Sequence, residues 1–138
     1  MKSIALGALL VAVAATAAAD PPTDEQLEAL YARPSPFESV PRDQWIAESE
    51  NAFVVRSDEP LAPVHLLVIS KTRYPTMLQA SPELYQEMLL LARRVAEQEG
   101  VARSGFRIVI NTHPQGSQSV YHFLMHVLGG RQMQWPPG

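Results

Sequence analysis

The sequence predicts an α+β domain built on a mostly antiparallel sheet. A short helix, strands, one long helix and further strands follow one another along the chain, and this order is typical of the α+β class. The 138 residues are enough for one domain with its own core and too few for two ordinary domains. We therefore expect a single α+β domain.

Residues 1–19, MKSIALGALLVAVAATAAA, predict a signal peptide. A basic residue, Lys2, precedes an uncharged apolar run and then small residues, which is the pattern of a secretory signal cleaved after Ala19. The alternative is an uncleaved membrane anchor, but the run is short and rich in Ala and Gly. We expect an exported protein, periplasmic or secreted, with no membrane attachment after cleavage. It contains no cysteine, so disulfides are excluded.

Residues 20–36 are expected to form an N-terminal helix and a loop. Thr23 and Gln26 have the spacing of a capping box, which predicts a helix from Asp24 to about Ala32. Residues 37–138 then hold the main domain.

The strands are predicted from β-rich, apolar runs between turn residues. The expected ranges are 45–47, 52–55, 64–70, 106–111 and 119–128. The run VHLLVIS, residues 64–70, is almost continuously apolar, which favours a central strand.

The long helix follows Ser81, a good capping residue, and begins at Pro82. Gly100 is expected to end it. Its apolar face repeats at helical spacing through Leu84, Met88, Leu91 and Val95.

The charge pattern argues against a protein that binds nucleic acid. The formal net charge is −3 and no dense run of Lys or Arg is present, whereas a duplex binder needs a basic face to neutralise phosphates. A small nucleotide remains compatible, because one phosphate needs only a few donors.

The stretch YHFLMHVLGG places His122 and His126 four residues apart. On a helix this spacing would suit a zinc site, but the Val, Tyr and Phe content and the two closing glycines favour a strand. A strand would separate the imidazoles by roughly 13 Å, too far to share one metal ion, so we expect no metal. It would also place Leu124 on their face, with Phe123, Met125 and Val127 on the core face. An alternative is that both histidines are half-buried and bonded to backbone carbonyls.

Three stretches resemble the histidine triad (HIT) family, in its nucleotide phosphoramidase branch. QSVYHFLMHVLGG with its tail RQMQWPPG is similar to the C-terminal signature of the family, whose motif is His-φ-His-φ-His-φ-φ with φ apolar. APVHLLVIS and RIVINTHPQGSQSVYH resemble the strands and the loop that complete the site. The resemblance covers residues 37–138. It implies a HIT-like fold, with a five-stranded mainly antiparallel sheet, one long and one short helix, and a homodimer that joins two such sheets.

The resemblance implies a site in which the middle histidine attacks the α-phosphorus of a nucleoside phosphoramidate, forming a nucleotidyl-histidine that water hydrolyses. Leu124 occupies that nucleophile position. His122 and His126 occupy the outer positions, which in the family orient the nucleophile and hold phosphate oxygens.

Nucleotide-binding positions are also implied by the resemblance. Asn111 and Ser119 match residues that donate hydrogen bonds around the phosphate, and His65 matches another pocket residue. The family's ribose-binding aspartate aligns with Ser57 without a gap, and with Asp58 after a shift of one residue. The resemblance implies no cofactor.

Two further positions depart from the family. His113 stands where a glycine is common, and Gln134 stands beside Trp135 where a histidine is frequent. His113 is a candidate for a relocated nucleophile, and the alternative is an ordinary surface histidine. Trp135 is expected near the partner's site in the dimer.

Three functional hypotheses follow. The first is an exported HIT protein that binds a nucleotide or small phosphate ligand with catalysis impaired or lost at Leu124. The second is a working hydrolase that uses a relocated nucleophile or an activated water, with the outer histidines as acid and base. The third is a non-catalytic interaction module that retains only the fold and the dimer surface.

Overall fold

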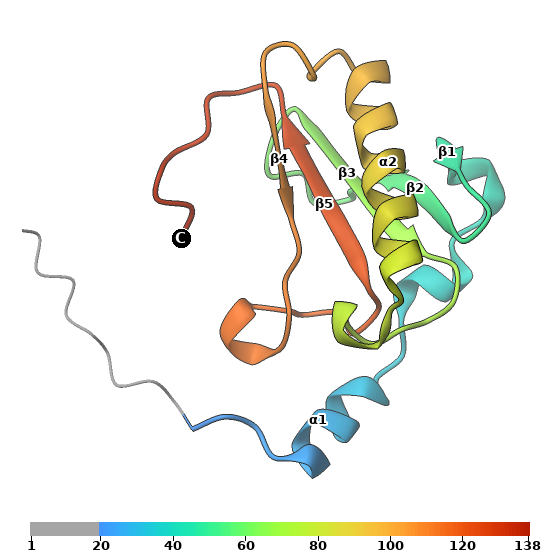
Figure 1. Ribbon diagram of the computed structural model, residues 1–138, viewed down its shortest axis with the longest axis vertical. Helices are drawn as coiled ribbons and strands as arrows, with labels where there is room; N and C mark the ends of the chain where they lie inside the picture. The colour runs from blue at the N-terminus through green and yellow to red at the C-terminus, as the bar shows by residue number, and fades with distance from the viewer. Residues whose placement is uncertain (1–19) are drawn as a thin grey trace, which may run out of the picture.

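The computed structural model describes residues 20–138, so the predicted signal peptide, residues 1–19, lies outside the described residues. The described chain forms one five-stranded sheet in the order β1-β2-β3-β5-β4, with every neighbouring pair antiparallel (Figure 1). The predicted α+β class and the five-stranded antiparallel sheet are confirmed. Among the helices of residues 20–138, none has the length and apolarity needed to cross a membrane.

The strands lie close to their predicted places. They are β1 (Ala47–Glu48), β2 (Ala52–Arg56), β3 (Val64–Ser70), β4 (Phe106–Val109) and β5 (Leu124–Gly129). β3 is central, as predicted, and pairs with β2 on one side and β5 on the other. β1 begins at Ala47 rather than Trp45, although the Ile46 N–H still donates to Val54 O at 2.9 Å.

Two strands are shorter than the sequence predicts. β4 ends at Val109 rather than Asn111, and β5 begins at Leu124 rather than Ser119. Leu124 pairs with Ile69, and the Ser70 N–H donates to Phe123 O at 3.1 Å. β3 ends there, so the residues before Phe123 have no strand to pair with. His122 therefore precedes the strand, and only His126 lies on it.

Both predicted helices are present. α1 (Asp24–Tyr31) has the expected capping box between Thr23 and Gln26, and ends one residue earlier than predicted. α2 (Pro82–Gln98) is capped by the Ser81 hydroxyl, and Gly100 follows it with φ +76°, a conformation suited to glycine. The buried face of α2 includes the four predicted residues, Leu84, Met88, Leu91 and Val95.

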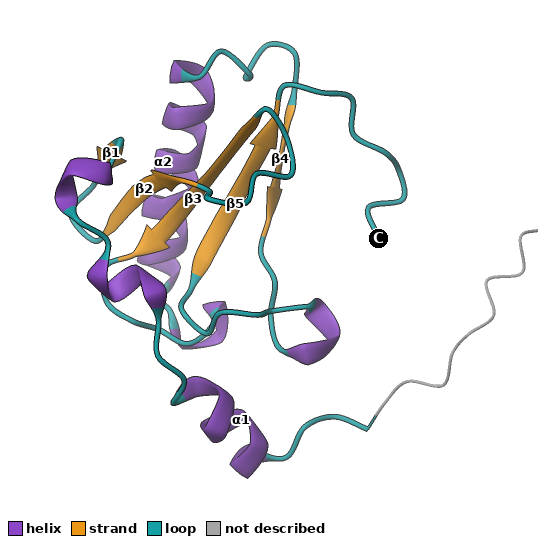
Figure 2. Cartoon of the chain, turned by 180° about the vertical axis from the view of Figure 1, so that it is seen from behind, coloured by secondary structure: helices purple, strands orange, loops and turns teal. Residues whose placement is uncertain are grey.

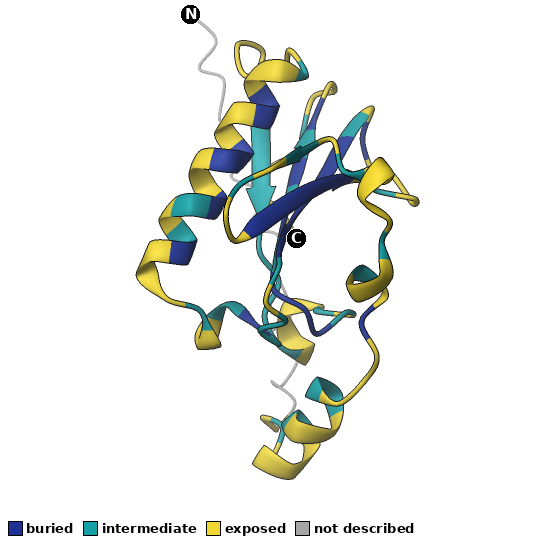
Figure 3. Cartoon of the chain, turned by 90° about the vertical axis from the view of Figure 1, so that its right-hand side faces the viewer, coloured by how far each residue is buried: buried dark blue, intermediate teal, exposed yellow. Residues whose placement is uncertain are grey.

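The core lies between α2 and one face of the sheet (Figure 3). β5 sends alternate side chains to it, because successive residues of a strand point to opposite faces. Phe123, Met125 and Val127 are buried there, which confirms the predicted core face. A second apolar cluster on the other face contains Phe53, Val55, Leu67 and Ile69, with Leu124, Phe37, Val40 and Trp45 packed against it.

The segment before β1 runs along this second face. We call residues 31–40 the N-terminal strap. It begins at the end of α1 and includes the short 3₁₀ turn Pro36–Ser39 (Figure 2). Arg73 fastens the strap by donating from Nη2 to the carbonyl oxygens of Tyr31, at 3.0 Å, and Arg33. Its guanidinium also pairs with Glu38 at 3.5 Å. The strap thus partly covers the face of the sheet opposite α2.

Candidate functional site

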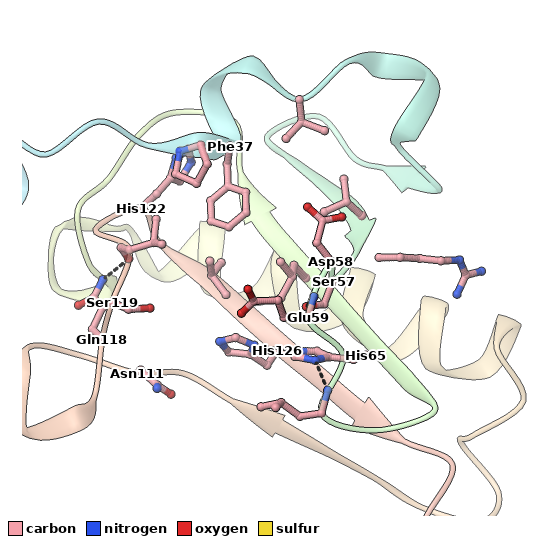
Figure 4. A pocket seen from close by; sticks show the side chains of 18 of the residues that line it. Phe37, Ser57, Asp58, Glu59, His65, Asn111, Gln118, Ser119, His122 and His126 are labelled. Atoms are coloured by element: carbon pink, nitrogen blue, oxygen red, sulfur yellow. Dashed lines mark hydrogen bonds between the residues drawn. The ribbon is translucent and has the colours of Figure 1, made fainter.

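A pocket of about 580 Å³ opens on the sheet face opposite α2 (Figure 4). The strap, the loop after β2, strands β3 and β5, and the loop before β5 contribute to its walls. It is lined by eight of the residues that the sequence predicted for the site, namely Ser57, Asp58, His65, Asn111, Ser119, His122, Leu124 and His126. These residues span much of the sequence, and the antiparallel pairing of β3 with β2 and β5 gathers them.

His126 and His65 form a hydrogen-bonded pair at one end of the pocket. His65 Nε2 lies 2.9 Å from His126 Nδ1, and the Leu61 N–H donates to His65 Nδ1 at 3.0 Å. Burial lowers the pKa of His65, and burial together with the neighbouring His65 lowers the pKa of His126. Both imidazoles are therefore neutral at pH 7.

His122 is held within the protein. Its side chain is 1% exposed, and its Nε2 lies 2.6 Å from Ser70 O while its Nδ1 lies 2.7 Å from Ser35 Oγ. A carbonyl oxygen only accepts, so Nε2–H donates to it and Nδ1 accepts from the serine hydroxyl. Burial lowers the pKa of His122 despite the bond to Ser70 O. Both ring nitrogens are thus already occupied. The alternative of two half-buried histidines bonded to backbone carbonyls holds only in part, because His122 is bonded to Ser70 O but fully buried, and His126 is bonded to His65.

Leu124 lies between the two outer histidines in the sequence and on the pocket face of β5. It pairs with Ile69 of β3 and packs against the apolar cluster that also contains Val55 and Leu67. An aliphatic side chain has no lone pair with which to attack phosphorus, so this position provides packing to the pocket floor and no nucleophile.

The loop before β5 forms the polar wall. Asn111 Nδ2 donates to Ser117 O at 3.3 Å, which closes the loop on itself. Gln118 braces it further, donating from Nε2 to Pro75 O at 2.8 Å and accepting at Oε1 from the His113 N–H at 2.9 Å. Hydroxyl and amide groups on this wall are suited to phosphate oxygens.

The loop after β2 brings carboxylates to the pocket. Ser57 Oγ accepts from the Glu59 N–H at 3.3 Å, and Asp58 and Glu59 both line the pocket. Figure 4 shows these residues across the pocket from Asn111 and Ser119. Ser57 and Asp58 thus both line the pocket, and their ribose-binding role stays a prediction.

Several pocket residues were missed by sequence reasoning. Glu59 directly follows Asp58, and Gln118 adjoins Ser119, so proximity in sequence was the available signal. Phe37 lines the pocket and contacts the His122 ring edge-on, with ring centroids 5.8 Å apart. Ser35 does not line the pocket but is bonded to His122, and it carried no sequence signal because His122 is distant in the chain.

His113 lies outside the pocket lining. Its Nε2 is 2.6 Å from the hydroxyl of Tyr31, and the two rings stack at 5.9 Å. Its φ of 63° falls in the region that favours glycine, consistent with the glycine expected there from the resemblance. The His113 side chain therefore joins the strap to the 111–118 loop, which does not suit the candidate role of relocated nucleophile.

The C-terminal tail extends from the sheet edge (Figure 1). Arg107 on β4 donates to Gln134 O at 2.8 Å, and Trp135 is 82% exposed. Neither Gln134 nor Trp135 lines the pocket.

Within residues 20–138, no group of three or more His, Cys, Asp or Glu side chains is placed to hold a metal ion. The His65–His126 pair supplies two imidazoles, and two of their nitrogens, His65 Nε2 and His126 Nδ1, are already bonded to each other.

Comparisons with known proteins agree with the geometry. The HIT domain family model matches residues 38–133. The chain is 47% identical over 98 residues to adenylylsulfatase HINT1 of Arabidopsis thaliana, covering 67% of this chain and 66% of that protein. It is 43% identical over 81 residues to purine nucleoside phosphoramidase of Escherichia coli strain K12, covering 56% of this chain and 68% of that protein. The chain thus spans about two thirds of the length of either relative.

A solved structure gives the same result. The crystal structure of a HIT family hydrolase from Legionella pneumophila Philadelphia 1 superposes with a TM-score of 0.66 at 40% identity, covering 69% of this chain and 88% of that one. The family model covers more than half of the chain and the solved structure shares its fold, so the chain belongs to the HIT domain family.

Proposed function

We propose that this protein binds a nucleotide or another small phosphate ligand and has little or no phosphoramidase activity. The observation that carries the proposal is Leu124 on the pocket floor, at the position that matches the family's nucleophile. Removing a covalent nucleophile reduces turnover by on the order of 10⁶. The polar wall of Asn111 and Ser119 and the neutral imidazole of His126 remain to hold a phosphate group.

Binding without turnover is a chemically coherent outcome. Phosphate oxygens need hydrogen-bond donors, which amide, hydroxyl and imidazole N–H groups supply without a fixed positive charge. Formation of a nucleotidyl intermediate needs in addition a nucleophile in line with the leaving group, and attack tolerates little misplacement. His122, bonded to Ser35 and Ser70, is not free to take that role.

Calorimetric titration with AMP and GMP, paired with an adenosine phosphoramidate turnover assay, tests this proposal. We expect binding of at least one nucleotide and no turnover above the uncatalysed rate. Robust turnover by the natural protein would overturn the proposal in favour of a working hydrolase. Absence of binding to either nucleotide would favour a non-catalytic interaction module.

We also propose export, with residues 1–19 removed after Ala19. The support is the sequence pattern of a basic start, an apolar run and small residues before Asp20. Mass spectrometry of the protein recovered from the source cells would give an N-terminus at Asp20. An intact Met1 in a membrane fraction would show the anchored form instead.

A homodimer is proposed from the surface of the subunit. β4 is an edge strand of the sheet, and helix α2, which contacts β3 and β5, exposes Leu89 and Leu90, at 45% and 55% exposed. An open strand edge and exposed apolar side chains each favour association with another chain. Light scattering coupled to size-exclusion chromatography would give twice the chain mass, and a monomer at all concentrations would exclude the dimer.

A further inference from the structure

Three groups form a hydrogen-bonded chain at one end of the pocket. The Leu61 N–H donates to His65 Nδ1 at 3.0 Å, and His65 Nε2 lies 2.9 Å from His126 Nδ1. His126 Nε2, at the end of this chain, has no hydrogen-bond partner among the described residues. Figure 4 shows His65 and His126 side by side, with His126 on the side nearer Asn111.

The backbone amide sets the direction of the whole chain. An amide N–H can only donate, so His65 Nδ1 must be unprotonated to accept from it. A neutral His65 then carries its proton on Nε2 and donates it to His126. His126 Nδ1 therefore accepts, and the proton of His126 must sit on Nε2.

We propose that His65 is a positioning residue that, together with the Leu61 amide, fixes His126 in the Nε2–H tautomer. The pocket then presents a hydrogen-bond donor to its ligand and no imidazole base at this point. The tautomer follows from the contacts alone, whereas its use in ligand recognition rests on the proposed function.

The other tautomer of His126, with its proton on Nδ1, would bring two N–H donors into contact. For His126 Nε2 to accept a proton from water, the His126 proton would first have to move to Nδ1. His65 Nε2 would then accept, and the His65 proton on Nδ1 would point at the Leu61 N–H only 3.0 Å away. A buried hydrogen bond would be replaced by a repulsive contact, which is unfavourable. His126 is therefore not suited to activate a water molecule as a general base.

This polarity selects the chemistry of the ligand. The group that meets His126 must carry an acceptor, such as an oxygen of a phosphate, sulfate or carboxylate. Leu124 adjoins this donor on the pocket face of β5, so the same end of the pocket combines one fixed N–H with an aliphatic surface.

The test compares two side chains of the same shape at position 65. His65→Gln can accept from the Leu61 N–H through Oε1 and donate to His126 through its amide, so it should preserve the tautomer. His65→Glu offers only acceptor oxygens near neutral pH, so it should draw the His126 proton to Nδ1. Uniformly ¹⁵N-labelled full-length protein without ligand is measured by long-range ¹H–¹⁵N NMR at about pH 8, where the imidazoles are neutral.

We expect the Nε2–H tautomer of His126 in the natural protein and in His65→Gln, and the Nδ1–H tautomer in His65→Glu. With AMP as the probe, His65→Glu should bind at least about tenfold more weakly than His65→Gln. A His126 proton on Nδ1 or averaged over both nitrogens in the natural protein would overturn the inference, as would an unchanged tautomer in His65→Glu. If AMP binds to none of the three, the proposed function fails while the ligand-free spectra still decide the tautomer.

Discussion

Ser35 Oγ lies 2.7 Å from Nδ1 of His122. This bond joins the N-terminal strap to the chain just before β5. His122 is buried, and its other nitrogen is bonded to Ser70 O. The imidazole therefore connects the strap to the sheet, and it serves the fold as well as the pocket.

Ser35→Ala should destabilise the protein. The substitution leaves the Nδ1 acceptor of His122 buried without a donor, so we expect the free energy of unfolding to fall by about 1–3 kcal/mol. Urea denaturation followed by circular dichroism gives the value. Ser39→Ala is the matched control, because Ser39 is exposed and its hydroxyl makes only a 3.4 Å contact with Pro36 O. Equal midpoints for the two variants would contradict a structural role for the bond.

Gly129→Ala should also destabilise the protein, by about 1–3 kcal/mol. A Cβ at this position would lie 2.9–3.1 Å from three side-chain atoms of Val101, closer than packed carbons tolerate. Combining it with Val101→Ala should recover part of the loss, because the smaller side chain makes room. Gly116→Ala serves as control, since its Cβ would meet only Asn111 C at 3.9 Å. If the losses of stability of Gly129→Ala and Val101→Ala simply added in the double variant, the contact between the new Cβ and Val101 would not be the cause of the destabilisation.

Stability should decrease as the pH falls below about 6.5, the usual pKa of histidine. Burial lowers the folded-state pKa of His65, His122 and His126, so the unfolded chain binds more protons than the folded one in this range. The contribution is complete above the unfolded pKa and is lost as the pH falls toward the folded values. Each histidine adds a slope of at most about 1.4 kcal/mol per pH unit.

Urea midpoints measured between about pH 7.5 and 5.5 check this dependence. The pKa of Glu48 is lowered from its usual value of 4.5, chiefly by its hydrogen bond with Lys71. Glu48 therefore changes the stability only at a pH below the range tested. The variant His65→Gln combined with His126→Gln should have a shallower slope than the natural protein. A natural protein with constant stability across the range would contradict neutral, buried histidines.

The sequence was sufficient to predict the class of fold and most of the candidate residues that the structure places around one pocket. Alternating apolar residues assigned the core face of β5, and the helical spacing of Leu84, Met88, Leu91 and Val95 assigned the buried face of α2. These periodicities act locally, so they can be read without tertiary information. The resemblance to the family then identified residues that the structure places around one pocket.

Other features depended on contacts between distant parts of the chain. β5 begins at Leu124 because β3 ends at Ser70, and neither limit is written in the local pattern around His122. The pairing of His122 with Ser35, and of His113 with Tyr31, joins residues more than eighty positions apart. The local sequence of the 111–118 loop likewise could not show that His113 would face the strap rather than the pocket.

The role of Leu124 is tested most directly by restoring a histidine. Leu124→His places an imidazole on the pocket floor between the outer histidines, and circular dichroism with a urea midpoint first verifies that the variant folds. We predict that steady-state hydrolysis of adenosine phosphoramidate rises from background in the natural protein to a readily measured rate in Leu124→His. A natural protein already as active as the variant would contradict the inference that Leu124 has removed the chemistry from this site.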